Sequence, residues 1–386
     1  MFSDDSKHLT TMNSTEHLYS IALTHLAGLN LQMAPQLVHV LGSVQAVYEH
    51  RNNICDAIPD FSPRLANSLK DWSEALRRAE EEIAFTERHH IKVLTINDND
   101  YPQRLVNCPD APLVLYFLGS TDLNPVHTIS IIGTRHSTSY GHDIIRHLIS
   151  DLRQMGVMPL VISGLAYGID VCAHRESLAN GFDTVGVLAH GLDELYPPRH
   201  RDTAKEMTQH GGLLTEYMSH TRVDKINFVR RNRIVAGMSD ATILVESAAH
   251  GGGLITCSIA QDYNRAVFAF PGAVGAQHSE GCNKLIRNNG AELITSAADL
   301  IESMGWQNDM QLQQAQAKGI ERQLFPDLSE EELSIVNVLK DIGDVQLNIL
   351  SVKTNIPIGQ LSATLFQMEM KGIVRPLAGG SYHLLS

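Results

Sequence analysis

The sequence of 386 residues predicts an α/β fold: a parallel sheet flanked by a helical start and a winged helix-turn-helix end. Three observations lead to this prediction. Short apolar, β-branched runs alternate with helical patterns in the middle of the chain. The first part of the chain shows helical periodicity without such runs. The last part begins a new set of three short helical patterns, followed by a hairpin pattern.

The N-terminal segment, residues 16–88, has the pattern of several short helices that are interrupted at Gly28 and Gly42. Its last part, 71–88, is charged and periodic, with Leu76, Ala79 and Ile83 on the inward side. We assign residues 1–120 to an N-terminal helical domain. Small helical modules often mediate contacts with partners, and plain packing against the rest of the chain is an equally good interpretation.

The middle of the chain contains six strand-like runs that are apolar throughout. They are residues 129–132, 160–163, 184–188, 213–217, 242–246 and 266–270. Strands that are apolar on both sides are typical of a parallel sheet covered by helices on both faces. We assign residues 121–305 to this domain. Residues 306–328, rich in glutamine and without apolar periodicity, are expected to be a linker.

The tail, residues 329–386, begins with a capping box, in which Ser329 is the N-cap and Glu332 is the third helical residue. Helices are expected at 330–341, 346–354 and 358–371, and a hairpin with a Gly379-Gly380 turn follows. This is the winged helix-turn-helix pattern, whose third helix often reads DNA. Here that helix carries one base, Lys371, beside Glu369, so DNA binding and protein contact both remain open.

Composition excludes several classes of protein. The five cysteines form no C-x-x-C pair, and the 19 histidines are scattered without ligand spacing, so we expect neither a metal site nor a disulfide framework. The N-terminus is polar and lacks the apolar core of a signal peptide, and no apolar run is long enough to span a membrane. The sequence therefore indicates a cytoplasmic protein without a cofactor.

The net charge of −13 argues, taken whole, against a nucleic-acid binder. The acidity, however, lies in the flanks: residues 128–296 contain 15 basic and 16 acidic residues. Within them, residues 222–233 hold five bases against Asp224. At helical spacing Arg230 and Arg233 share one side, and Arg231 is offset by about 100°. Either a salt-bridged internal helix or a clamp for phosphates explains this segment.

The strand ends carry the second indication of a ligand, because most of them open onto glycine, serine or threonine. Glycine allows backbone N–H groups to approach an anion closely, and a following helix N-terminus adds a positive dipole. Ligands of open α/β sheets bind at this edge. The loops therefore predict a groove for a phosphate-bearing ligand. The candidates from these loops are Gly133, Thr134, Arg135, Ser163, Gly164, Tyr167, Gly168, Gly251, Gly252, Gly253 and Thr256.

Two common nucleotide motifs are missing. Residues 133–138 lack the pattern G-x-G-x-x-G, and no acidic residue ends the second strand to hold a ribose hydroxyl. The pattern G-x-x-x-x-G-K-S/T is also absent. A standard dinucleotide site and a P-loop ATPase are therefore not expected.

Taken in order, the loop motifs resemble the DprA family, also called Smf, the DNA-processing proteins of bacterial transformation. The matching stretches are Ile131–Arg135, Ser163–His174, Gly191–Pro197, Phe228–Gly237, Pro271-Gly272 and Gly281–Ile286. The resemblance implies an extended Rossmann-like central domain with a helical, SAM-like start and a winged-helix end. It also implies a non-enzymatic homodimer that binds and protects single-stranded DNA and loads the RecA recombinase onto it.

By this resemblance, the strand's path is lined by residues of the loops and of the basic segment. To the loop candidates above it adds Arg231, Arg233 and Lys284, and we include their neighbours Arg230 and Asn232. Two departures weaken individual contacts. Tyr167 stands where many members have a basic residue, and His250–Gly253 replaces the usual Ser-Gly-Ser pattern. Tyr167 either stacks on a base or packs in the fold.

Two other functions remain open from the sequence. The first is a nucleotide phosphoribohydrolase of the LOG type, for which Glu246 and Gly251–Gly253 superficially fit, although the glutamate precedes the glycines. The second is a protein-interaction adaptor that acts through its two end domains. Acidic flanks are also expected to discourage duplex binding, through Glu80–Glu82 among others.

Overall fold

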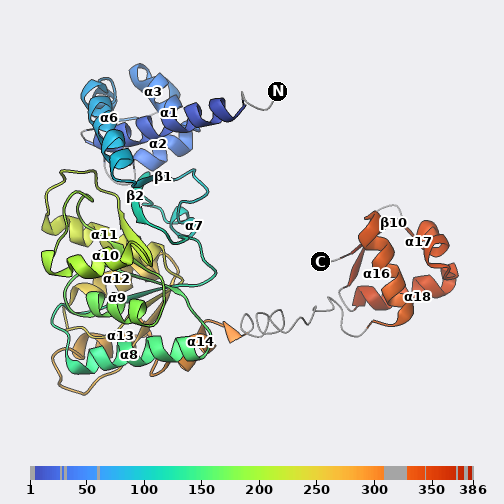
Figure 1. Cartoon of the computed structure of the whole chain (residues 1–386). Coiled ribbons are helices and arrows are strands. Elements are labelled where there is room, and N and C mark those ends of the chain that lie inside the picture. Colours follow the sequence, from blue (N-terminus) through green and yellow to red (C-terminus); the bar gives the residue numbers. More distant parts are fainter. Residues whose placement is uncertain are drawn as a thin grey trace. The chain divides into compact units, whose positions relative to one another are not determined.

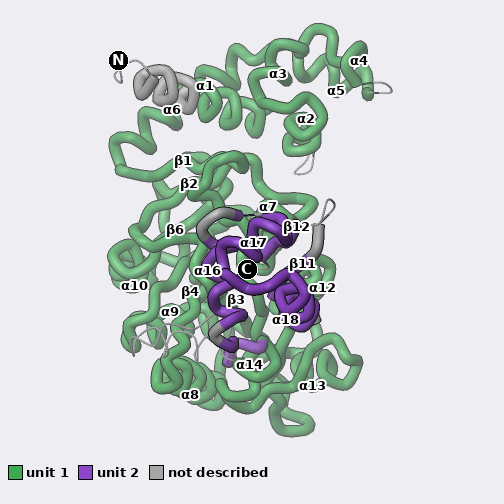
Figure 2. Tube along the Cα trace, turned by 90° about the vertical axis from the view of Figure 1, so that its right-hand side faces the viewer, with its two compact units in different colours: residues 1–304 green, residues 305–386 purple. Residues whose placement is uncertain are grey.

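The structure, a computed structural model (Figure 1), describes most of the chain. The described residues are 5–26, 28–29, 33–58, 61–307, 328–343, 345–370, 373–377 and 381–384. Two compact units divide the chain, residues 1–304 and residues 305–386 (Figure 2). Each unit is described by itself. Most of the predicted linker, 306–328, lies outside the described residues.

The first unit begins with a cluster of helices. These are α1 (Asp5–His25), α2 (Met33–Leu41), α3 (Val44–Glu49), α4 (Ile54–Ala57), α5 (Pro63–Ser68) and α6 (Ser73–Arg88), with a 3₁₀ turn at His50–Asn52. Their shared core holds Ile21, Val47 and Trp72, and it continues into Tyr116 and Met218 of the sheet domain. The helical cluster therefore packs on the sheet through one continuous apolar core rather than through a polar linker.

A nine-stranded, mostly parallel sheet follows, in the order β1-β2-β6-β5-β4-β3-β7-β8-β9. Its strands are β1 (Lys92–Thr95), β2 (Val114–Gly119), β3 (Thr128–Ile132), β4 (Leu160–Ser163), β5 (Thr184–Val187), β6 (Gly211–Thr215), β7 (Ala241–Leu244), β8 (Ala266–Ala269) and β9 (Glu292–Leu293). The pairs from β6 through β3 to β9 are all parallel. The two strands β1 and β2 are antiparallel additions at one edge.

Both faces of the sheet are buried, which confirms the interpretation of the apolar runs. Consecutive residues Leu213 and Leu214 of β6 belong to different cores, because successive side chains of a strand point to opposite faces. The six predicted runs correspond to β3 to β8, with ends that differ by one or two residues.

The helices of this domain connect and cover the strands. They are α7 (Gln103–Val106), α8 (Ser139–Gln154), α9 (Ile169–Ala179), α10 (Arg201–Met207), α11 (Lys225–Gly237), α12 (Gly252–Asp262), α13 (Glu280–Arg287) and α14 (Ala297–Ser303). Ile234 of α11 and Cys257 of α12 share one core with the sheet residues Val187 and Leu244. Ala204 of α10 belongs to the other core. This α/β arrangement is the Rossmann-like fold that the sequence predicts.

The sheet starts earlier in the chain than the predicted boundary at residue 120. Residues 92–95 and 114–119 form β1 and β2, which lie in the segment assigned to the helical domain. The short strand β9 was also missed. β1 is an edge strand, and β2 lies between β1 and β6. Both strands are paired antiparallel, and that pairing depends on contacts far along the chain that local periodicity does not carry.

The second unit contains three helices and a small antiparallel sheet. The helices are α16 (Glu330–Ile342), α17 (Leu347–Thr354) and α18 (Ile358–Met370), and the strands are β10 (Val345–Gln346), β11 (Val374–Leu377) and β12 (Ser381–Leu384). The predicted capping box is present, since Glu332 N–H donates to Ser329 Oγ at 3.2 Å and Ser329 N–H donates back to Glu332 at 2.9 Å. The predicted turn at Gly379-Gly380 lies outside the described residues.

Within the described ranges, no helix combines the length and the apolar composition that a membrane span requires.

Candidate nucleic-acid interface

The site is built where the strand order of the sheet reverses direction. From β3 the chain adds β4, β5 and β6 on one side, and then crosses back to pair β7 with the other side of β3. The carboxyl ends of β3, β4 and β7 therefore lie side by side at the switch point of the sheet. Loops at such a point diverge and leave a crevice, which is where ligands of open α/β sheets bind.

A cavity of about 340 Å³ occupies this crevice, and we call it the glycine groove. Its predicted lining residues come from three strand ends and from α11. They are Gly133, Thr134, Arg135, Gly164, Arg231, Asn232, Gly251, Gly252, Gly253 and Thr256. Eight residues that were predicted from separate strand-end loops, and two from the basic segment, thus meet in one groove.

Close packing explains most of these glycines. A Cβ at Gly164 would lie 2.5 Å from Arg231 Nη2, and one at Gly133 would lie 2.6 Å from Ile169 Cγ1. A Cβ at Gly253 would meet Leu244 Cδ1 at 2.7 Å. Gly252 is different, because nothing lies within 4 Å of a Cβ built there. Gly252 is the first residue of α12, whose free N–H groups and dipole favour an anion in the groove.

Arg135 supplies positive charge at the surface of the groove. It is exposed, and its guanidinium lies 5.4 Å from the ring centroid of Phe228, within the range of a cation–π contact. No hydrogen bond or ion pair within the described residues engages the Arg135 side chain. Arg135 is therefore available to a phosphate of a ligand.

Arg231 also lines the groove, but it is buried and bound to the protein. Its Nη1 donates to the carbonyl of Gly164 at 2.8 Å and to the carbonyl of Val187. Burial lowers the pKa of Arg231 to about 10, and the neighbouring Asp170 opposes that shift. Arg231 thus ties the ends of two strands together and forms the floor of the groove.

A second hollow of about 640 Å³ adjoins the groove, and the two share Arg135 and His136. Tyr167 and Gly168 line this hollow rather than the groove. Tyr167 is 40% exposed, and its ring packs edge-on against the ring of His200, with 5.0 Å between the two ring centroids. Gly168 has φ +78°, and a Cβ there would lie 2.2 Å from the carbonyl of Thr134, so only glycine fits.

Four predicted residues lie elsewhere. Ser163 is fully buried beneath the groove, and its hydroxyl donates to the carbonyl of Ile131 at 2.7 Å. Arg230 and Arg233 line a different pocket on the other side of α11. Lys284 is exposed on α13 and does not line the groove. The helical offset expected between Arg231 and the pair Arg230 and Arg233 is thus confirmed.

Arg233 has the surroundings of an internal salt bridge. Its Nη2 lies 2.5 Å from Glu216 Oε2, and its Nε lies 3.8 Å from Asp110 Oδ2. Burial raises the pKa of Glu216, and the charge of Arg233 opposes this rise. For Arg233 the structure therefore agrees with the salt-bridged interpretation of the basic segment, and for Arg231 it gives a structural role in the groove floor.

Sequence reasoning missed the apolar side of the groove, which includes Phe228, Val229 and Ile255. Phe228 and Val229 lie between the bases of the segment 222–233, and this interleaving was the signal available for them. Among the described residues, no group of three or more His, Cys, Asp or Glu side chains is placed to hold a metal ion. The groove is therefore suited to phosphates and flat apolar groups, held by backbone N–H groups and Arg135.

A family model described as DNA recombination-mediator protein A matches residues 92–305, more than half of the chain. The chain belongs to the DprA/Smf family. The match begins at β1, so the family's domain includes the two antiparallel strands β1 and β2. The chain is 30% identical to the protein Smf of Synechocystis, in an alignment that covers 96% of this chain and 99% of that protein.

Solved structures of DprA proteins agree with this assignment. The DNA processing protein A of Streptococcus pneumoniae is 29% identical and superposes with a TM-score of 0.63, covering 74% of this chain and 97% of that one. The DNA processing protein A of Helicobacter pylori is 28% identical, with a TM-score of 0.50 over 56% of this chain and 97% of its own. The H. pylori structure was solved to show how that protein binds single-stranded DNA.

Proposed function

We propose that this protein binds and protects single-stranded DNA in the glycine groove, without catalysis, and loads the RecA recombinase onto the bound strand. One observation carries the proposal: three glycine-rich strand ends, a helix N-terminus and the exposed Arg135 converge on one groove. Backbone N–H groups and a guanidinium hold phosphates without reading bases, which is what a sequence-tolerant strand binder needs.

The family and one relative support this proposal. The chain belongs to a family of recombination mediators, and the H. pylori DprA protein, which shares the fold, binds single-stranded DNA. The regional charge is consistent with it as well. Exposed charges more than about 8 Å apart are screened at physiological salt, so the net charge of −13 does not by itself argue against binding at Arg135.

The strand's path would continue from the glycine groove into the second hollow, past Arg135. There Tyr167 offers an exposed ring for one base, and base stacking on an aromatic side chain contributes about 1–3 kcal/mol. The glycine groove would then hold the backbone of the strand, and the hollow would hold a base.

The remaining features of the proposal come from the resemblance. They are a homodimer, a cytoplasmic location, a SAM-like N-terminal domain and a winged-helix C-terminal domain.

The three helices and small sheet of residues 328–384 support the winged-helix assignment. The third helix, α18, has Glu369 near its end and no base within its bounds, Ile358–Met370, which favours protein contact over DNA contact for that domain.

The phosphoribohydrolase alternative has less support. Glu246 is buried, and its carboxylate accepts hydrogen bonds from the N–H of Thr138 at 2.8 Å and from its hydroxyl at 2.6 Å. It lines a different pocket from Gly251–Gly253, one that contains Tyr140 and Pro271. A carboxylate held in this way positions the start of α8 and does not face the glycine groove.

A gel-shift series tests the function directly. The full chain is titrated against a single-stranded and a duplex oligonucleotide of mixed sequence over a range of salt concentrations. We expect the single strand to bind more tightly, with an affinity that falls linearly on a logarithmic salt scale. Equal binding of both forms, or release of free base from nucleotides by the pure protein, would contradict the proposal.

A further inference from the structure

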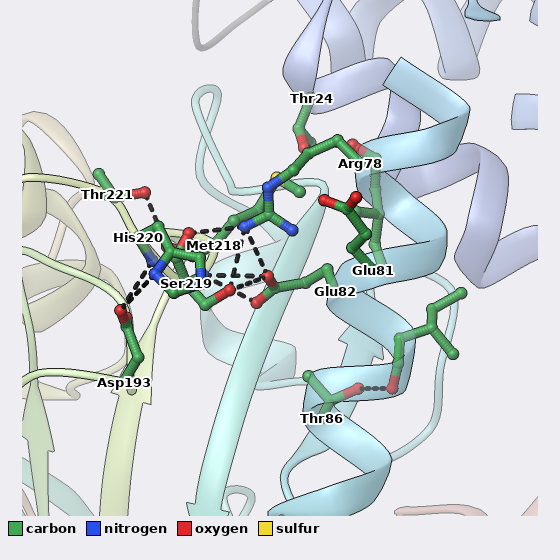
Figure 3. A network of polar contacts seen from close by, with 12 residues as sticks. Thr24, Arg78, Glu81, Glu82, Thr86, Asp193, Met218, Ser219, His220 and Thr221 are labelled. Atoms are coloured by element: carbon green, nitrogen blue, oxygen red, sulfur yellow. Dashed lines mark hydrogen bonds and ion pairs between the residues drawn. The ribbon is translucent and has the colours of Figure 1, made fainter. Parts of the chain in front are cut away.

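A cavity outside the proposed strand path lies between the N-terminal helices and α11, and we call it the junction pocket. It has a volume of about 690 Å³. One wall comes from α1, α2 and α6, and the other comes from the segment 216–221 and from α11. Figure 3 shows part of its rim, where Thr24 and Arg78 face the segment 218–221. Pockets for small molecules have volumes of about 300–1,000 Å³.

The polar side of the junction pocket is a buried pair, Arg233 and Glu216. The pair is joined by a single hydrogen bond, from Arg233 Nη2 to Glu216 Oε2 at 2.5 Å. Its other three polar atoms, Arg233 Nε, Arg233 Nη1 and Glu216 Oε1, are buried and have no hydrogen-bond partner among the described residues. The pair therefore retains unused donors and an unused acceptor. Since unsatisfied buried charged groups are costly, this pair calls for a ligand that supplies both partners.

Other lining residues complete a binding site with an apolar body. Leu113, Val114 and Met218 form apolar walls, and the hydroxyl of Tyr217 is a further buried polar atom without a hydrogen-bond partner within the described ranges. Arg230 is exposed, lines the same pocket and makes no hydrogen bond with any described residue. The pocket thus combines buried polar groups, apolar walls and a cation open to solvent.

We propose that the junction pocket binds a nucleobase, with the attached phosphate on Arg230. Each base carries an acceptor next to an N–H donor on its pairing edge, for example O6 and N1–H of guanine, and this edge matches the free atoms of Arg233 and Glu216. Apolar walls suit the faces of a base. The nucleobase belongs either to a free nucleotide or to the strand itself, because α11 separates the junction pocket from the glycine groove and contributes residues to both.

Calorimetric titration with the four deoxynucleoside monophosphates tests this site in the full chain. We expect saturable binding of at least one of them, and a loss of about tenfold in affinity in Tyr217→Phe, which removes one hydroxyl without opening a cavity. Arg230→Ala is expected to weaken binding of the monophosphate but not of the corresponding nucleoside. Arg222→Ala is the matched control, because Arg222 is exposed in the same basic segment and does not line the pocket.

The result that overturns the proposal is a folded protein that binds single-stranded DNA but none of the four nucleotides at millimolar concentration. Unchanged nucleotide affinity in both Tyr217→Phe and Arg230→Ala would overturn it too. A strand-binding failure of the wild-type protein would instead concern the glycine groove. A competition experiment, in which nucleotide is added to the protein bound to single-stranded DNA, identifies the source of the base. If the nucleotide weakens strand binding in the wild type but not in Tyr217→Phe, the pocket holds a base of the strand. Nucleotide binding without competition indicates a free nucleotide.

Discussion

The carboxylate of Glu82 on α6 accepts hydrogen bonds from both the backbone N–H and the hydroxyl of Ser219, at 2.9 and 2.6 Å (Figure 3). Arg78, one turn earlier on α6, donates to Glu82 and to the carbonyl of Ser219. The pair therefore joins the N-terminal helices to the loop between β6 and α11. Glu82 was expected to contribute to an acidic surface that discourages duplex binding, but it is 2% exposed and fully engaged.

Removing this carboxylate should destabilise the first unit. Glu82→Ala leaves the guanidinium of Arg78 without its counter-ion and the buried N–H of Ser219 without its acceptor, so we expect a loss of about 3 kcal/mol in the free energy of unfolding. Glu81→Ala is the control. Glu81 is an exposed neighbour paired with Arg77, and its loss should cost less than about 1 kcal/mol. Urea unfolding of both variants measures the difference, and equal losses would contradict the assigned role.

Arg135→Ala tests the charge of the glycine groove. We expect the affinity for single strands of every sequence to fall about tenfold at low salt. The slope of the logarithm of the affinity against the logarithm of the salt concentration should become shallower by about 0.7, the value for one phosphate contact on a single strand. Arg222→Ala removes the same net charge outside the groove and should leave the slope unchanged. A salt series by fluorescence anisotropy provides both numbers.

Gly252→Ala separates anion binding from packing. The new methyl group meets nothing within 4 Å, so the melting temperature should stay constant or rise, since replacing glycine at a compatible position stabilises by about 0.4–1 kcal/mol. Strand affinity should nevertheless fall, because the methyl group stands over the N-terminus of α12. Gly164→Ala, which would clash with Arg231, should instead lower the melting temperature. Full strand affinity in Gly252→Ala would remove the helix N-terminus from the proposed site.

Tyr167 tests the second hollow. In Tyr167→Phe the ring is kept, and strand affinity should remain within about twofold of the wild type. Tyr167→Ala should lower the affinity about tenfold, by loss of stacking on one base. Tyr167 is partly exposed, so neither variant should change the melting temperature strongly. If both variants bind like the wild type, the strand does not pass this residue.

His174 makes stability depend on pH. Its ring is fully buried, Nδ1 lies 2.7 Å from the hydroxyl of Thr184, and Nε2 has no hydrogen-bond partner among the described residues. Burial lowers the pKa of His174 to about 3, and the neighbouring His200 and Arg231 lower it further. Below the ordinary pKa of about 6.5 the unfolded chain gains a proton that the folded chain does not. The folded state is therefore destabilised progressively as the pH falls from about 6.5 toward 3.

His174→Asn, which retains a donor for Thr184, should remove this dependence. Between about pH 6 and pH 4 the free energy of unfolding of the wild type should fall more steeply than that of the variant, by about 1.4 kcal/mol per pH unit. Because other groups titrate equally in both proteins, the difference between the two slopes isolates His174. Equal slopes of the free energy of unfolding against pH in the two proteins would mean that His174 is protonated in the folded state or keeps its ordinary pKa there.

The sequence alone determined the parallel core of the sheet and most of the groove. The apolar runs that become β3 to β8 are local signals, and the glycines after β3, β4 and β7 are placed by the chain order of those strands. Parallel strands put their carboxyl ends at one edge, so Gly133, Gly164 and Gly251 were expected to meet without knowledge of the tertiary structure.

Only the tertiary structure decided how each charged side chain is used. Arg231 and Arg233 are two residues apart in one basic segment, yet Arg231 binds the carbonyls of two strand ends and Arg233 pairs with Glu216. Their partners lie 67, 44 and 17 residues away in sequence, and no local pattern encodes such distances. The energy of a buried charge depends on what surrounds it in space, so the sequence places the bases and the fold decides which of them remain available to a ligand.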